Sequence, residues 1–192
     1  MPQLILASTS PYRRELLARL PLEFEVVAPG VVEEHLHGES PADRALRLAT
    51  AKARAVSTRH PHALVIGSDQ VAACRGEVLD KPGDAARCRG QLSRLSGQSA
   101  HFYTACALLG AHPLTHLSHV DTTTVVFRSL SGGEIERYVE RERPFDCAGG
   151  FRVEGSGIAL FEYIESQDPT ALIGLPLIWL AAALRAAGLQ LP

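Results

Sequence analysis

The stretch from Leu4 to Leu17, LILASTSPYRRELL, constrains the fold more than any other part of the chain. It opens with four apolar residues, 4–7, which is typical of a short buried strand. Three hydroxyl residues follow, and Pro11 then stands where a helix would begin, because proline fixes φ and lacks the N–H that a first helical turn leaves unpaired. The pattern predicts a strand, a hydroxyl-rich loop and a helix, in that order.

The loop before this helix suits an anion. Backbone N–H groups and the positive end of the helix dipole face it, and the guanidinium groups of Arg13 and Arg14 can bind phosphate oxygens in a bidentate fashion. A capped helix with surface arginines explains the same residues, so this stretch alone leaves both interpretations open.

Composition limits the function classes that remain. The chain has 192 residues, 46% of them hydrophobic, and a formal net charge of −2, so we expect one globular domain over residues 1–192 and no general attraction to nucleic acid or anionic membranes. The four cysteines show no C-x-x-C spacing, and the start of the chain lacks the pattern of a secretory leader, which together favour a reducing, cytoplasmic location. The apolar stretch 171–187 is interrupted by Gly174, Pro176 and Arg185 and is therefore expected to be a core helix, with no membrane partner.

Helical and strand patterns alternate in the first half of the chain, and β-hairpin signals increase in the second half, so we expect an α/β protein with a mixed sheet. The expected strands are 24–28, an extended segment at 31–34, 64–66, 101–109 and 121–130, with a hairpin at 74–79 and a polar, histidine-bearing connection before residue 121. The expected helices follow Ser40-Pro41 and Asp84 and cover 134–141 and 175–187.

Asp69 is the strongest candidate for chemistry. It follows the apolar strand 64–66, which places its carboxylate at the carboxyl end of a strand, where open α/β sheets bind ligands. A carboxylate there can hold Mg²⁺ or accept a proton from water, although a turn aspartate that caps its own backbone is the simpler alternative. Glu33 and Glu34 offer a second carboxylate site at a strand end, with a solvated acidic pair as the alternative.

Three cations lie near loops or on a small-residue helix face, where their long side chains can converge: Arg13, Lys52 and Lys81. Carboxylates, convergent cations and a hydroxyl loop together suit a triphosphate bound with a divalent metal. The glycine-rich stretch 149–157 lacks the ending of a P-loop. His112, His116 and His119 have ligand-like gaps, but Pro113 argues against a helix that would align them.

Several motifs occur together in a characteristic order: LILASTSPYRRELL, IGSDQV, LDKPGD, HFYTA and CAGGFRVEGSGIALF. In this combination the chain resembles the Maf-like nucleoside triphosphate pyrophosphatases over nearly its whole length. The resemblance implies a fold related to the inosine triphosphatases, with a long mixed sheet and two lobes flanking an active cleft. It also implies hydrolysis of a nucleoside triphosphate to the monophosphate and pyrophosphate with a divalent metal: Mg²⁺, Mn²⁺ or Co²⁺.

Site roles follow from the resemblance position by position. Asp69 matches the catalytic base, and Glu33 matches an acidic position that would share a metal with it. Val32 stands where many members have aspartate, which leaves the exact metal ligands open. The positions that match the phosphate-handling residues are Ser8, Arg13, Lys52 and Lys81.

Three further positions concern the base. Tyr12, Gln70 and Glu154 stand where members acting on dTTP and UTP usually have Arg, Thr and Gln, so the chain resembles the branch that hydrolyses 7-methyl-GTP. A carboxylate at Glu154 could accept both N–H donors of a guanine edge, and the ring of Tyr12 could receive a positively charged base.

We therefore expect a metal-dependent pyrophosphatase that removes modified nucleotides, 7-methyl-GTP first, with Asp69 activating water. A dTTP/UTP-type enzyme of the same family is the first alternative. A non-catalytic cell-division regulator that binds a protein partner is the second. The sequence leaves the oligomeric state open, and a homodimer is one state that it allows.

Overall fold

The computed structural model describes residues 3–110 and 116–192. Within them, seven strands form one mixed sheet: β1 (Leu4–Ala7), β2 (Glu25–Val27), β3 (Leu64–Cys74), β4 (Glu77–Leu79), β5 (Ser99–Leu109), β6 (His116–Phe127) and β7 (Phe161–Glu165). The helices are α1 (Pro11–Leu17), α2 (Pro41–Ser57), α3 (Ala85–Leu95), α4 (Gly132–Glu142) and α5 (Leu177–Ala186). Short 3₁₀ helices are η1 (Ala148–Gly150), η2 (Ser156–Leu160) and η3 (Ala171–Ile173). This arrangement confirms the expected α/β class with a mixed sheet.

The strands follow the order β2-β1-β3-β5-β6-β7, with β4 paired to β3. β1 pairs in parallel with both β2 and β3, whereas β3, β5, β6 and β7 pair antiparallel to one another. The parallel pairing of β1 with β3 ends at the pair Ala7 and Gly67, while β3 continues along β5 as far as Cys74. The sheet therefore has a parallel part at one end and a long antiparallel ribbon that extends beyond it.

This extension corrects the expected position of Asp69. The residue lies inside β3, paired with Ala105 of β5, and not at the carboxyl end of a short strand. The strand that ends nearby is β1, and its chain turns away through the hydroxyl loop into α1. The edge that carries the loop is thus the carboxyl end of β1, and β3, its neighbour in the sheet, continues past that end without a break.

The helices begin where the sequence places capping side chains. A side-chain oxygen accepts the backbone N–H of the residue three positions later at each of four helix starts: Ser10, Ser40, Asp84 and Ser131. At α4 the cap is reciprocal, because Glu134 also accepts the N–H of Ser131 in a capping box. These local bonds explain why the starts of the helices were predictable.

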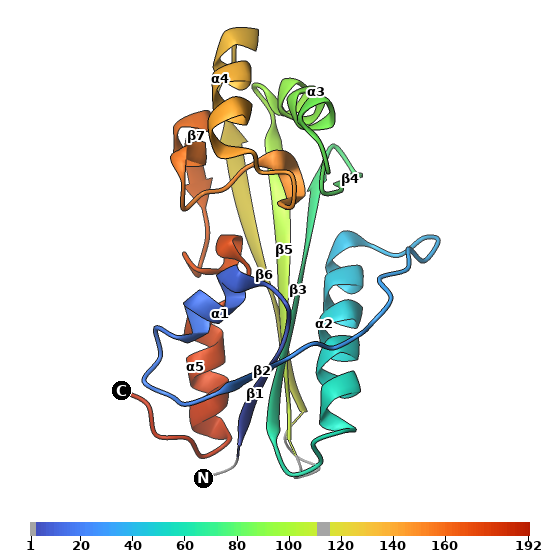
Figure 1. The fold of residues 1–192 in the computed structure, drawn as a ribbon, viewed down its shortest axis with the longest axis vertical. Helices are drawn as coiled ribbons and strands as arrows, with labels where there is room; N and C mark the ends of the chain where they lie inside the picture. Colours follow the sequence, from blue (N-terminus) through green and yellow to red (C-terminus); the bar gives the residue numbers. More distant parts are fainter. Residues whose placement is uncertain (1–2, 111–115) are drawn as a thin grey trace.

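Both faces of the parallel part of the sheet are covered (Figure 1). Leu4 and Leu6 belong to the cluster that includes residues of α1 and α5, whereas Ile5 and Ala7 pack with Ala53 of α2. Because alternate residues of a strand point to opposite faces, a strand covered on both sides has to be apolar throughout, as β1 is.

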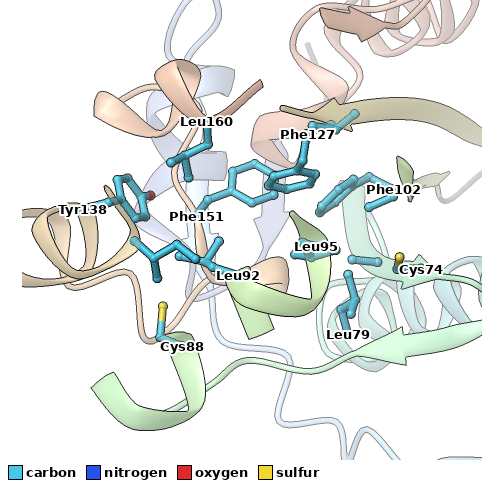
Figure 2. Packing of buried hydrophobic residues seen from close by; sticks show 14 of the residues in the cluster. Cys74, Leu79, Cys88, Leu92, Leu95, Phe102, Phe127, Tyr138, Phe151 and Leu160 are labelled. Atoms are coloured by element: carbon cyan, nitrogen blue, oxygen red, sulfur yellow. The ribbon is translucent and has the colours of Figure 1, made fainter. Parts of the chain in front are cut away.

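A second core fills the other end of the sheet, under α3 and α4 (Figures 1 and 2). Phe151 lies at its centre and packs edge-on against three aromatic rings, those of Phe102, Phe127 and Phe161, at centroid distances of 5.3, 5.6 and 4.8 Å. Edge-to-face contacts at such distances stabilise beyond the area they bury. This core fixes the segment from η1 to Phe151, which forms one wall of the site described below.

The structure also bears on two expectations for the histidine-bearing region before residue 121. The part of the expected connection from His116 to residue 120 is strand, because β6 begins at His116. His112 lies outside the described residues, and the ring of His119 stacks on Trp179 at 5.5 Å.

Nowhere in residues 3–110 and 116–192 do three His, Cys, Asp or Glu side chains form a group that could hold a metal ion. No helix in these same ranges is long and apolar enough to cross a membrane.

Candidate active site

A close approach of α2 to β3 builds the base of the site. Gly67 makes it possible, because a Cβ there would lie 2.6 Å from the backbone N and 2.8 Å from the Cβ of Ala53, and closer still to the carbonyl oxygen of Ala49. Alanines on this face of the helix keep the rest of the contact short. The helix and the strand are thereby held near enough for a lysine on one to reach an aspartate on the other.

Lys52 joins two carboxylates at this point. Its Nζ lies 2.5 Å from Oδ1 of Asp69 and 2.5 Å from Oε1 of Glu33. The side chains of Lys52 and Asp69 are each 8% exposed, whereas that of Glu33 is 49% exposed. The structure therefore brings together three residues that the sequence placed in three separate segments.

Glu33 arrives on a segment without regular secondary structure, not at the end of a strand as expected. Two arginines of α2 and its C-terminal turn hold this segment. Arg59 donates to the carbonyl of Ala28 at 2.9 Å, and Arg47 donates to the carbonyl of Glu34 at 2.9 Å. Arg47 also binds both carboxylate oxygens of Glu39, at 2.6 and 2.7 Å.

The charges around Glu33 favour its ionised form. Burial by itself raises the pKa of this carboxyl, but the hydrogen bond from Lys52 and the charges of Lys52, Lys81 and Arg13 outweigh it. The pKa of Glu33 is therefore lower than its ordinary value. The carboxylate is thus ionised at neutral pH and can act as a ligand for a cation.

The hydroxyl loop between β1 and α1 is closed by its own side chains. Ser8 Oγ accepts the N–H of Ser10 at 3.1 Å, and Ser10 Oγ accepts the N–H of Arg13 at 3.4 Å. Ser8 is only 3% exposed, so it lies beneath the loop. Burial lowers the pKa of the Arg13 guanidinium, an effect that the nearby Asp69 and Glu33 oppose.

The carbonyl of Gly174 orients Arg13. It accepts a hydrogen bond from Arg13 Nε at 2.9 Å, and Ser68 Oγ lies 2.8 Å from the same oxygen. Gly174 has a φ of 127°, which a residue with a side chain rarely adopts. The segment that carries this carbonyl is anchored by Gln70, whose amide nitrogen donates to the carbonyl of Leu172 at 3.0 Å.

One cleft collects these groups. Each site residue assigned from the family resemblance lines it except Ser8: Tyr12, Arg13, Glu33, Lys52, Asp69, Gln70, Lys81 and Glu154. Of the other candidates, Arg14 and Glu34 do not line it. The hydroxyl that faces the cleft from the β1–α1 loop is that of Ser10. The sequence thus located the cleft, while the roles assigned to individual side chains stay predictions.

Sequence reasoning assigned a role to only one residue, Glu154, in one wall of the cleft. This wall comes from the segment before and after η1 and includes Asp146, Cys147 and Arg152. The guanidinium carbon of Arg152 lies 5.3 Å from the centre of the Tyr12 ring. Burial, together with the neighbouring Cys147 and Asp146, raises the pKa of Tyr12 to about 12. The available signal was the motif CAGGFRVEGSGIALF, in which a role was predicted for Glu154 alone.

The donor set fits a divalent metal. Magnesium is commonly bound by one or two carboxylates together with phosphate oxygens of the substrate and water. Asp69 and Glu33 supply two carboxylates that already converge on one cation, the Nζ of Lys52. The two residues could therefore hold a metal that arrives with a triphosphate.

Comparisons with known proteins identify the fold and the family. The fold is shared with the Ham1 protein of Staphylococcus aureus (TM-score 0.56, 15% identity, 96% of this chain and 99% of that one) and with a HAM1 protein from Coxiella burnetii (TM-score 0.53, 16% identity, 97% and 100%). A family model described as Maf-like protein matches residues 3–187. The chain is 54% identical over the full length of both proteins to a protein of Xanthomonas oryzae pv. oryzae named 7-methyl-GTP pyrophosphatase. It is 53% identical to one of the same name from Aromatoleum aromaticum, over 99% of this chain and 98% of that one.

Proposed function

The chain belongs to the Maf-like family, and from that premise we propose that it hydrolyses 7-methyl-GTP to 7-methyl-GMP and pyrophosphate. The observation that carries the proposal is the junction of Lys52 with Asp69 and Glu33 in a cleft that Arg13 and Lys81 also line. Carboxylates and cations at one point are what the hydrolysis of a metal-bound triphosphate requires. The names of the relatives supply the substrate.

Asp69 is the residue assigned to water activation. Its carboxylate is held by Lys52 inside the cleft, and Oδ1 accepts the bond from the ammonium. The other oxygen is then the one that can accept a proton from an attacking water. A divalent metal bound by Asp69 and Glu33 would supply charge neutralisation at the phosphate oxygens. Arg13 and Lys81 stabilise the negative charge that builds up on the phosphate oxygens in the transition state.

Recognition of the base is assigned to the Tyr12 end of the cleft. Glu154 is an acceptor-only side chain that can take both N–H donors of a guanine edge, which thymine and uracil do not present. The ring of Tyr12 provides an aromatic face for a base that carries positive charge. The side-chain amide nitrogen of Gln70 already donates hydrogen bonds to the backbone carbonyls of Ala171 and Leu172. Its contribution to binding the base would therefore come through the carboxamide oxygen.

The test is a screen of pyrophosphate release with Mg²⁺, Mn²⁺ or Co²⁺ over the common nucleoside triphosphates and 7-methyl-GTP. Preference for 7-methyl-GTP supports the proposal, and preference for dTTP or UTP supports the first alternative instead. Release from none of them supports the binding-protein alternative. Hydrolysis in ¹⁸O-labelled water shows which phosphorus is attacked, because the label enters either the monophosphate or the pyrophosphate.

Two matched pairs of variants test the residue roles. Asp69→Asn should abolish turnover, whereas Asp121→Asn, an equally buried carboxylate on β6 outside the cleft, should retain it. Glu154→Gln should weaken the preference for 7-methyl-GTP, while Glu162→Gln, a change at an exposed residue of β7, should not. Full activity of Asp69→Asn would remove this residue from the mechanism.

A further inference from the structure

Arg152 carries a charge in the cleft that the mechanism above does not use. Its side chain lines the same cleft as Asp69 and Glu154. Among residues 3–110 and 116–192, no carboxylate forms an ion pair with its guanidinium, and its Nε is buried without a hydrogen-bond partner. Buried polar atoms are rarely left unpaired in folded proteins, so an orphaned one that borders a ligand site requires an explanation.

The guanidinium lies against an aromatic ring, and the charges of Glu154 and Glu142, which form no ion pair with it, also act on it. Its carbon lies 5.3 Å from the centre of the Tyr12 ring, within the range of a cation–π contact. Tyr12 is also the residue whose face is assigned to the positively charged base. In the structure, that face already holds a cation that belongs to the protein itself.

The backbone beneath Arg152 is fixed, so that only the side chain can give way. Its N–H donates to the hydroxyl of Tyr138 at 3.0 Å, and its carbonyl accepts the N–H of Gly155 at 3.3 Å. A Cβ at Gly157 would collide with that same carbonyl, so the turn is closely packed. A flexible charged side chain on a rigid turn can leave the ring without disturbing the wall of the cleft.

We propose that Arg152 is a specificity-determining residue: its guanidinium competes with the substrate base for the face of Tyr12 and disfavours a cationic base relative to a neutral one. A base that stacks on this face has to displace the guanidinium, whatever its charge. The displaced group stays in the cleft, where it repels the positive charge of an N7-methylated purine and attracts the O6 and N7 acceptors of an unmethylated one. This inference rests on the proposed function for the identity of the base and adds the residue that limits the selectivity.

The test is a comparison of Arg152→Gln with the wild-type protein in binding 7-methyl-GMP and GMP by calorimetry. It is done below neutral pH, where the methylated base keeps its N1 proton and its net positive charge. Neutralising Arg152 should raise the affinity for 7-methyl-GMP relative to GMP by about 3- to 10-fold, as expected for unit charges within roughly 10 Å across a partly hydrated cleft. The ratio of kcat/KM for the two triphosphates should shift in the same direction.

Two further variants separate charge from fold. Arg152→Lys keeps the charge and should leave the binding ratio near that of the wild type. Arg143→Gln removes a guanidinium that lies 5.7 Å from the ring of Phe145, outside the cleft, and should leave the ratio unchanged.

Two results overturn the inference: an unchanged ratio in Arg152→Gln, whether the affinities for both nucleotides stay the same or fall equally, and no binding of either nucleotide to either protein. The equal loss would mean that Arg152 holds the phosphate or ribose. Failure of the proposed function is distinguishable, because it appears as absent hydrolysis in the wild-type protein, while the binding ratio is measured without turnover.

Discussion

Replacement of Lys52 by methionine removes the ammonium that joins Asp69 and Glu33 but keeps most of the apolar side chain. The variant leaves the carboxylate of Asp69 in a position where its side chain is only 8% exposed, without the partner that lies 2.5 Å away in the wild-type protein. Removal of one member of a buried ion pair costs about 3–5 kcal/mol, because an uncompensated charge stays buried.

The structure places Lys52→Met at the lower end of that range. Asp69 borders a cleft that water enters, and the second carboxylate, that of Glu33, is 49% exposed and can be hydrated. We therefore expect the free energy of unfolding to fall by about 3 kcal/mol, which corresponds to about 6–12 °C in Tm for a chain of this size. Turnover should be lost as well.

A companion variant tests the cause of this loss. In Lys52→Met/Asp69→Asn no charge is left buried at the junction, so the double variant should be more stable than the sum of the two single changes predicts, by about 1–2 kcal/mol. A purely steric effect of methionine would give no such coupling.

The assay is urea unfolding followed by far-UV circular dichroism and by the fluorescence of Trp179, the single tryptophan of the chain. Agreement of the two probes and an unchanged m-value are required before the midpoints are converted into free energies. A loss below about 1 kcal/mol in Lys52→Met would refute the reasoning, because it would mean that the pair behaves as a solvated surface pair.

Three other changes have defined outcomes. Gly67→Ala places a Cβ against the backbone of α2 and should cost about 3 kcal/mol in urea unfolding together with most of the activity; a near-neutral variant would contradict the close packing. Hydrogen bonds from the side chain and backbone of Ser131, and then the nearby Arg128, lower the pKa of Glu134 from 4.5 to about 2. The stability that Glu134 adds relative to Glu134→Gln should therefore be complete above about pH 4.5 and disappear as the pH falls to about 2. A difference that persists unchanged at pH 2 would argue against the capping box. Arg47→Met should weaken Mn²⁺ binding by about 10-fold in titration calorimetry, because it releases the segment that carries Glu33. The control Arg54→Met, on the exposed face of α2, should leave Mn²⁺ binding unchanged. Equal effects of the two variants would rule out a positioning role for Arg47.

The parts of the fold that the sequence predicted well are those with local causes. Ser40 followed by Pro41 marks the start of α2, and Asp84 and Ser131 mark the starts of α3 and α4. Each of these signals acts within three residues, so it can be read from a short window. The hairpin between β3 and β4 was likewise predicted from its central Gly76.

The errors concern elements whose extent depends on distant partners. β3 continues through Asp69 because β5 pairs with it as far as Cys74, and nothing near residue 67 announces that pairing. Glu33 lies beside Lys52 because arginines of α2 and its last turn hold an irregular segment, not because a strand ends there. The wall of the cleft in which only Glu154 was predicted depends on where the aromatic core around Phe151 places its chain.

By itself, the sequence determined the order and capping of the helices, the apolar strand that has to be covered on both faces, and which residues could take part in phosphate chemistry. Only the tertiary structure decided which of them meet. Arg13 is oriented by the carbonyl of Gly174, which is 161 residues away in the chain, and Arg152 lies on the ring of Tyr12, which belongs to a distant segment of the chain. The physical reason is range: caps and alternation act between neighbours in the chain, whereas a site depends on long-range pairing and packing that no single segment contains.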